Sequence, residues 1–148
     1  MYRFVKVKKD RHDDSVKRIR DIEKEYKITF PKALKEYYMG YDNAPINLTK
    51  ITVNGYQCEV AKIIPIIGEK QNFEKIHEAD KKDGFIPSEF CPLARDRGGN
   101  YYYWNAKNGS VYLLLNDDIE NPFEVSKDVR SFFELLNAAN DGRHNGEN

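Results

Sequence analysis

The sequence has little of what metal binding, redox chemistry or membrane insertion requires. It contains two cysteines, Cys58 and Cys91, without the paired spacing of a zinc site or a redox disulfide. No apolar run approaches the roughly 20 residues of a membrane helix, and the first residues do not follow a signal-peptide pattern. We therefore expect a cytoplasmic protein with no membrane contact, no metal and no cofactor.

Net charge of one sign is also missing. Lysine plus arginine and aspartate plus glutamate number 24 each, so the chain has no overall field to hold a polyanion. Direct binding of nucleic acid is therefore not expected. The three histidines, His12, His77 and His144, have no serine or cysteine at a suggestive spacing, and we expect ordinary surface residues.

Apolar residues at three- and four-residue steps predict helices at both ends of the chain. These helices begin near Ser15 and Pro31 and, at the other end, after Ser126 as a capping residue. A shorter helix is predicted over residues 71–84, with the glycine at its end as the terminator. The segments between these helices are rich in β-branched and aromatic residues, which favour strands.

Two Asn-Gly pairs, at residues 54–55 and 108–109, supply the positive-φ positions of tight hairpin turns, and residues 91–96 suit a brief strand. We predict one α+β domain over residues 1–140, with a mainly antiparallel sheet built from two hairpins. The N-terminal and C-terminal helices are expected to pack on one face of that sheet. Residues 141–148 offer nothing to bury and are expected to form a disordered tail.

The stretch ARDRGGNYYYW, at residues 94–104, raises the question of a phosphate-binding loop. Amides of Gly98 and Gly99 beside Arg95 and Arg97 are the components of an anion nest. The stretch lacks the P-loop lysine-serine pair, and a strand follows it instead of the helix whose N-terminus would hold a phosphate. A phosphate site is therefore not favoured.

The aromatic run cannot form one stacking platform, because neighbouring side chains of a strand point to opposite faces. With a two-residue turn in the second hairpin, Tyr101, Tyr103 and Tyr112 face outward. With a three-residue loop and a glycine bulge, Tyr102, Trp104 and Tyr112 face outward instead. The run Lys-Asn-Gly at residues 107–109 favours the second arrangement slightly.

Asp117, Asp118 and Glu120 form an acidic cluster after the second hairpin. The cluster lacks the glycine-containing ligand ladder of a calcium loop, so we interpret it as a solvated loop before Asn121 and Pro122.

The order of these features resembles the SUKH superfamily, the Smi/Knr-type domain of fungal cell-wall regulators and bacterial toxin-immunity proteins. The matching stretches are IRDIEKEYKITFPKALKEYY, FCPLARDRGGNYYYWN, NGSVYLL and VSKDVRSFFELL, which span most of residues 19–136. The resemblance implies a non-enzymatic immunity protein that binds and neutralises a cognate toxin's C-terminal domain, commonly a nuclease. It also leaves open an intracellular interaction or regulatory module on the same fold.

Tight protein complexes are anchored by tyrosine, tryptophan and arginine with charged neighbours. We therefore expect a monomer or weak dimer that contacts its protein partner through the outer sheet face and adjoining loops. The predicted contact residues are Arg95, Asp96, Arg97, Tyr102, Trp104, Tyr112, Asp117, Asp118 and Glu120.

Overall fold

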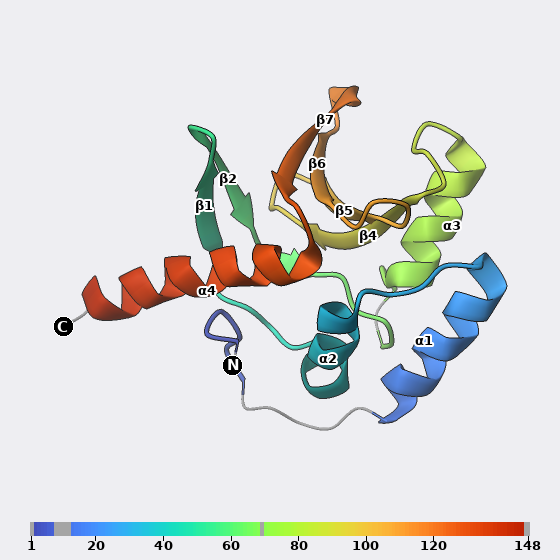
Figure 1. Cartoon of the computed structure of the whole chain (residues 1–148), viewed down its shortest axis with the longest axis horizontal. Coiled ribbons are helices and arrows are strands. Elements are labelled where there is room, and N and C mark those ends of the chain that lie inside the picture. Colours follow the sequence, from blue (N-terminus) through green and yellow to red (C-terminus); the bar gives the residue numbers. More distant parts are fainter. Residues whose placement is uncertain (1, 8–12, 69, 147–148) are drawn as a thin grey trace.

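Helices stand at both ends of the chain and strands between them, as Figure 1 shows. The computed structural model describes residues 2–7, 13–68 and 70–146. The helices are α1 (Asp13–Tyr26), α2 (Lys32–Tyr41), α3 (Phe73–Asp83) and α4 (Val129–Gly146). The strands are β1 (Thr49–Val53), β2 (Tyr56–Val60), β3 (Lys62–Ile63), β4 (Phe90–Arg95), β5 (Tyr101–Asn105), β6 (Val111–Leu115) and β7 (Asp118–Ser126). The predicted α+β class is confirmed.

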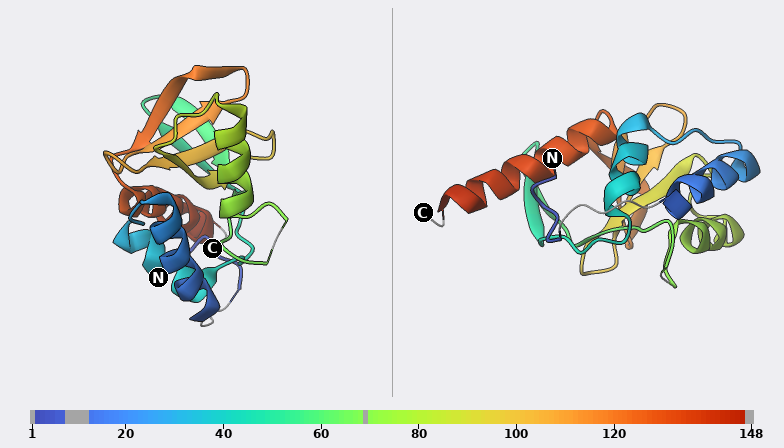
Figure 2. Two further views of the ribbon diagram at one scale, coloured as in Figure 1. Left: turned by 90° about the vertical axis from the view of Figure 1, so that its right-hand side faces the viewer. Right: turned by 90° about the horizontal axis from the view of Figure 1, so that it is seen from below.

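The strands form two antiparallel sheets instead of one. A five-stranded sheet has the order β3-β4-β5-β6-β7, and β1 and β2 form a separate hairpin. The amide of Ala61 still donates to the Arg95 carbonyl at 2.9 Å, so the chain leaves the hairpin and joins the sheet at β3. Because β2 diverges from β4 at this point, the hairpin stands beside the sheet, as seen in Figures 1 and 2.

Helices cover both faces of the five-stranded sheet. The main core lies between one face and helices α1, α2 and α4, which confirms that the N-terminal and C-terminal helices share a face. A smaller cluster on the other face contains Phe90, Tyr103 and Leu114, and α3 stands beside it. The Tyr103 hydroxyl donates to Asp80 of α3 at 2.9 Å, which fixes this helix to the sheet.

The aromatic run divides between these two faces. Tyr102 and Trp104 pair with Leu113 and Val111 and point into the main core, where both are almost fully buried. The prediction that they face outward was wrong, because the hairpin loop has neither two nor three residues. The Asn105 amide donates to the Ser110 carbonyl at 2.9 Å, which leaves residues 106–109 as the loop. Loops of two and four residues send the same alternate side chains of the strand to the core. A three-residue loop sends the other set of side chains there.

The acidic segment after the second hairpin forms a strand that the sequence did not predict. Strand β7 pairs with β6 at the edge of the sheet, with register shifts near both ends of the pairing. Pro122 lies inside β7 and had suggested a loop. Pro122 falls within the register shift between the Leu113–Phe123 and Leu115–Asp118 pairs, and an edge strand tolerates a proline at such an irregularity.

Helix α4 begins and ends at different residues from those predicted. Asp128, not Ser126, caps it, because its Oδ1 accepts from the Ser131 amide at 2.7 Å. The predicted boundary at residue 140 lies within the helix, which continues to Gly146, while residues 147–148 lie outside the described part of the chain. Each added helical residue contributes one hydrogen bond, so a helix can extend beyond its last buried contact.

His77 is buried, contrary to the expected surface position. Its ring stacks on Phe73 at 5.4 Å and meets Tyr26 edge-on at 5.0 Å, between α3 and α1. Its Nδ1 has no hydrogen-bond partner among the described residues. Burial lowers the pKa of His77, and nearby Lys81 lowers it further while Glu78 opposes the change. The other two histidine predictions fall on residue 12 and on the side chain of residue 144, outside the described part.

No helix in the described ranges has the length and apolar character needed to cross a membrane.

The buried position of Trp104 can be checked by fluorescence, because it is the only tryptophan of the chain. We expect blue-shifted emission and weak quenching by acrylamide in the native protein, since the indole is shielded from water. Unfolding in urea should shift the emission to the red and restore quenching. Native emission that matches a solvent-exposed indole would contradict the packing described here.

The buried His77 predicts that acid weakens the fold. The unfolded chain, with an ordinary histidine pKa near 6.5, binds the proton more readily than the folded protein. The neutral, buried His77 therefore contributes its full stabilisation above about pH 6.5. This stabilisation is lost as the pH falls through the lowered pKa of His77 in the folded protein. His77→Phe keeps an aromatic ring against Phe73 without the titration. Urea unfolding at several pH values should show a smaller loss of stability in acid for this variant; equal losses would contradict the prediction.

Candidate functional site

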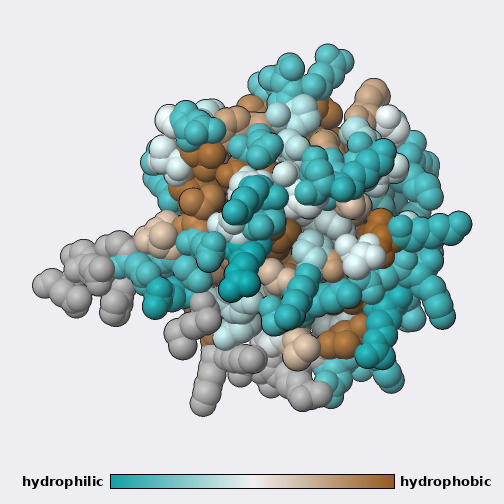
Figure 3. Space-filling model, viewed as in Figure 1, coloured by the Kyte–Doolittle hydropathy of each residue, from teal (hydrophilic) through white to brown (hydrophobic). Residues whose placement is uncertain are grey.

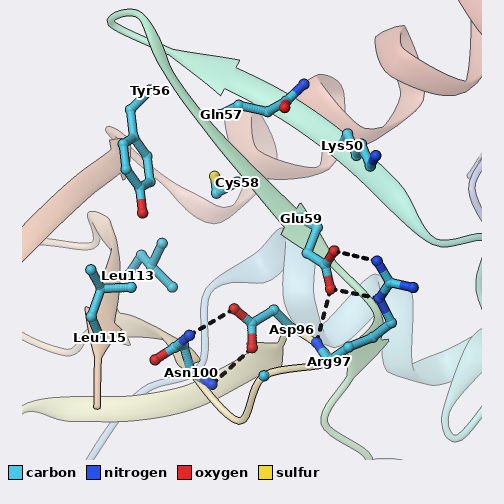
Figure 4. A pocket seen from close by; sticks show the side chains of 11 residues that line it. Lys50, Tyr56, Gln57, Cys58, Glu59, Asp96, Arg97, Asn100, Leu113 and Leu115 are labelled. Atoms are coloured by element: carbon cyan, nitrogen blue, oxygen red, sulfur yellow. Dashed lines mark hydrogen bonds and ion pairs between the residues drawn. The ribbon is translucent and has the colours of Figure 1, made fainter. Parts of the chain in front are cut away.

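A groove lies between the β1–β2 hairpin and the five-stranded sheet. We call it the hairpin groove; its volume is about 710 Å3, and it is open to solvent. Its floor is apolar and includes Cys58, Leu113 and Leu115, while charged side chains stand at one end (Figure 4). Figure 3 shows apolar atoms gathered over the hairpin region, with polar atoms around them.

One end of the hairpin groove is closed by an ion pair between Glu59 of β2 and Arg97. The Arg97 Nε and Nη2 donate to the two carboxylate oxygens of Glu59 at 3.0 and 2.9 Å. The backbone amide of Arg97 donates to the same carboxylate at 3.0 Å. These hydrogen bonds lower the pKa of Glu59 to about 2, and those from the Arg97 side chain have the largest effect.

The hairpin is attached to the sheet at the same residue by its backbone. The Tyr102 hydroxyl donates to the Glu59 carbonyl at 2.6 Å. Tyr102 thus reaches from the sheet through the core to β2. The sequence predicted Tyr102 as a contact residue. In the structure it is buried and holds β2, one wall of the groove, in place.

The other end of the groove is bounded by an aromatic contact. Tyr56 at the start of β2 packs against Phe123 of β7, with ring centroids 5.1 Å apart. Tyr56 is 41% exposed, so its ring is available to a partner while it touches the sheet. The sequence analysis did not single out Tyr56, Phe123 or Glu59; the abundance of tyrosine and the position of Tyr56 directly after an Asn-Gly turn were the available signals.

The Gly-Gly pair belongs to a tight loop between β4 and β5. The Asp96 carboxylate accepts from the amide and the side chain of Asn100 at 2.8 and 2.9 Å. Gly99 has a positive φ of 85°, and a Cβ there would lie 3.4 Å from Asn116. The amides on either side of the Gly-Gly pair, those of Arg97 and Asn100, donate to the carboxylates of Glu59 and Asp96, whose negative charge beside the glycine amides opposes an anion. This loop is therefore built for rigidity and not for phosphate binding.

The loop between β4 and β5 is joined to the turn between β6 and β7. The Asn116 amide donates to the Asn100 side chain at 2.8 Å. Asp117 and Asp118, in and after this turn, are exposed, as is Glu120 further along β7. These two connections, the β4–β5 loop and the β6–β7 turn, form one surface at the same end of the sheet, with acidic side chains at its rim.

The nine predicted contact residues separate into three groups. Arg95, Asp96 and Arg97 lie in or beside the first connection, and Asp117, Asp118 and Glu120 in or beside the second. Tyr102 and Trp104 are buried in the main core. Tyr112 lies on the other sheet face, where its ring contacts Phe90 at 5.4 Å. The structure thus brings six of these residues to one end of the molecule.

Both cysteines of the chain are buried. Burial raises the pKa of the Cys58 thiol, and it raises that of Cys91 to about 12, so neither is a thiolate at neutral pH. Within the described ranges, no group of three or more histidine, cysteine or acidic residues is arranged to hold a metal ion. What the site presents is an apolar floor, aromatic and charged ends, and an acidic rim.

These features define an α+β domain in which hydrogen-bonded loops frame an open groove with an apolar floor. A family model described as the SMI1 / KNR4 family (SUKH-1) matches residues 15–137. The chain belongs to this family, which confirms the resemblance seen in its motifs. None of the curated proteins compared with the chain matches it.

The ion pair predicts a pKa change that can be measured by carboxyl NMR. In Arg97→Gln the hydrogen bonds that favour the charged form of Glu59 are weakened, so its pKa should rise from about 2 toward the ordinary value of about 4.3. Lys50→Gln is the matched control, because Lys50 has only a minor effect on Glu59. Equal Glu59 titration in the wild type and Arg97→Gln would show that the pair does not form in solution.

Proposed function

We propose that this protein is a non-enzymatic immunity protein that binds a cognate bacterial toxin domain and blocks its active site. Membership of the SMI1 / KNR4 (SUKH-1) family supports this proposal. The observation that carries it is the bond between Asn116 and Asn100, because it joins two loops from different hairpins into one acidic rim beside an apolar groove. A preformed surface of this kind loses little conformational entropy on binding.

The charges of the rim favour a nuclease as the toxin. The whole chain has no net charge, whereas the exposed side chains of the β6–β7 turn are acidic. A nuclease binds phosphates through basic residues, and carboxylates placed over those residues replace the phosphates of its substrate. Complementary charges of this kind increase the association rate and exclude partners of the wrong sign.

The hairpin groove supplies the apolar part of the same contact. Tyr56 and the half-buried floor residue Leu115 offer area for a side chain of the toxin, as the centre of a protein interface requires. Arg97 is held by Glu59 and so presents a fixed guanidinium edge instead of a mobile charge. We propose a cytoplasmic monomer or weak dimer that acts by this occlusion alone.

Co-expression with the C-terminal domain of the toxin encoded next to this chain tests the proposal. The wild type should restore growth and co-purify with the toxin domain. Asp117→Lys with Asp118→Lys places two positive charges against a basic partner, so the affinity should fall by about tenfold or more while the fold is retained. Isothermal titration calorimetry and circular dichroism measure the two quantities.

Asp21→Lys with Glu25→Lys is the matched control, since it makes the same change in net charge on exposed positions of α1. This control should bind like the wild type. Full affinity of the Asp117 and Asp118 variant would remove the turn from the contact. Absence of rescue and binding by the wild type would instead favour an interaction or regulatory module with another partner.

A further inference from the structure

A second groove lies on the opposite face of the same end of the sheet. We call it the α3 groove, because α3 and the residues after it form one wall and β5, β6 and β7 form the other. Its volume is about 250 Å3. Small-molecule sites usually measure about 300–1,000 Å3, so this groove suits one or two side chains of a protein better than a cofactor.

An exposed phenylalanine stands at the rim of the α3 groove. Phe85 is 76% exposed, more than any other large apolar side chain in the described ranges. Gly84 ends α3 in the left-handed conformation, with a φ of 78°, and its amide bonds to the Asp80 carbonyl. This cap sets the direction in which the chain carries Phe85 away from the helix. Exposed aromatic side chains beside apolar clusters are typical anchors of protein interfaces.

The groove carries charge of one sign. Its charged lining residues, within the described part of the chain, are Asp80 and Asp83. The Asp80 carboxylate accepts one hydrogen bond, from the Tyr103 hydroxyl. Burial raises the pKa of Asp80; the Tyr103 hydrogen bond opposes this change, and the nearby Asp83 adds to it. A carboxylate that is partly removed from water gains from an incoming cation, so the groove favours a lysine or arginine.

The two grooves share the β6–β7 turn. Leu115 lines the hairpin groove, whereas Leu114 and Asn116 line the α3 groove, because neighbouring strand residues face opposite ways. Ile119 of β7 completes the apolar lining of the α3 groove. The acidic turn at residues 116–118 therefore forms a ridge between two apolar hollows.

We infer that the α3 groove binds a basic segment of the partner that also carries an apolar side chain. The basic group lies against Asp80 and Asp83, and the apolar side chain packs on Phe85 and Ile119. This inference rests on the proposed function and extends it: the toxin domain straddles the acidic turn and contacts both grooves.

A second copy of this chain is a poor occupant. A two-fold contact places the same patch of each copy against the other, which would bring the acidic pair of one groove toward its own counterpart. Like charges in that position oppose association. The acidic lining thus selects a different chain, of opposite charge.

Two exposed substitutions test the inference with the full chain and the same toxin domain. Phe85→Ala removes the anchor, and Asp83→Lys reverses the charge of the groove. Each should weaken binding by about tenfold or more in isothermal titration calorimetry. Met39→Ala and Glu36→Lys are the matched controls, because both positions are exposed on α2, away from the sheet. The controls should bind within about twofold of the wild type.

The outcomes separate this inference from the function on which it rests. Weaker binding by both test variants and not by the controls supports it. Wild-type protection with unchanged affinity of Phe85→Ala and Asp83→Lys overturns it and leaves the proposed function standing. Failure of the wild type to protect or bind overturns both. A concentration-dependent dimer that Phe85→Ala dissolves, seen by sedimentation, would also overturn it, since a second copy would then fill the groove.

Discussion

The contacts of Glu59 join the hairpin groove to the loop between β4 and β5, and the geometry of both depends on them. The Glu59 carbonyl accepts the Tyr102 hydroxyl from inside the domain, and its carboxylate holds Arg97 outside. Apart from these bonds, the β1–β2 hairpin is held by its packing on α4 and the main core, by Ala61, and by the Tyr56–Phe123 contact. The hairpin groove therefore has a defined width because a buried phenol and a surface ion pair meet at one residue. The same pair fixes the first residues of the Gly-Gly loop, which in turn positions the acidic turn through Asn116.

Local patterns were sufficient to predict most of the elements. The helical periodicity, the first Asn-Gly turn and Gly84 as a terminator correspond to structure within one or two residues of the expected places, whereas the second Asn-Gly pair ends a four-residue loop in which Gly109 but not Asn108 has a positive φ. The errors arise from side-chain contacts that periodicity and turn motifs do not indicate, one of them local and one distant along the chain. Side-chain parity in the second hairpin depended on a loop stabilised by the Asn105 side chain, which accepts from the amides of Lys107 and Asn108. His77 appeared polar in a charged helix, yet α1 supplies Tyr26 to cover it.

In the candidate site, too, some residues could be predicted from the local sequence and others could not. Asp96 and Arg97 were recognised because they flank a conspicuous Gly-Gly pair, and the acidic turn because its charges are consecutive. Glu59 lies 38 residues before Arg97, and nothing in its local sequence indicates that pairing. Alternation correctly placed Tyr102 and Trp104 on one face together, but only the packed helices decide which face is inside. The α3 groove was equally hidden, since it combines a helix end with three strands.

Pro122 in the edge strand has a consequence for the protein in a crowded cell. An unpaired strand edge is a template on which other extended chains can add. A proline removes one donor from the edge, and the register shifts of β7 make it irregular. The residue that concealed this strand in the sequence thus makes the open edge of the sheet a poorer template for aggregation.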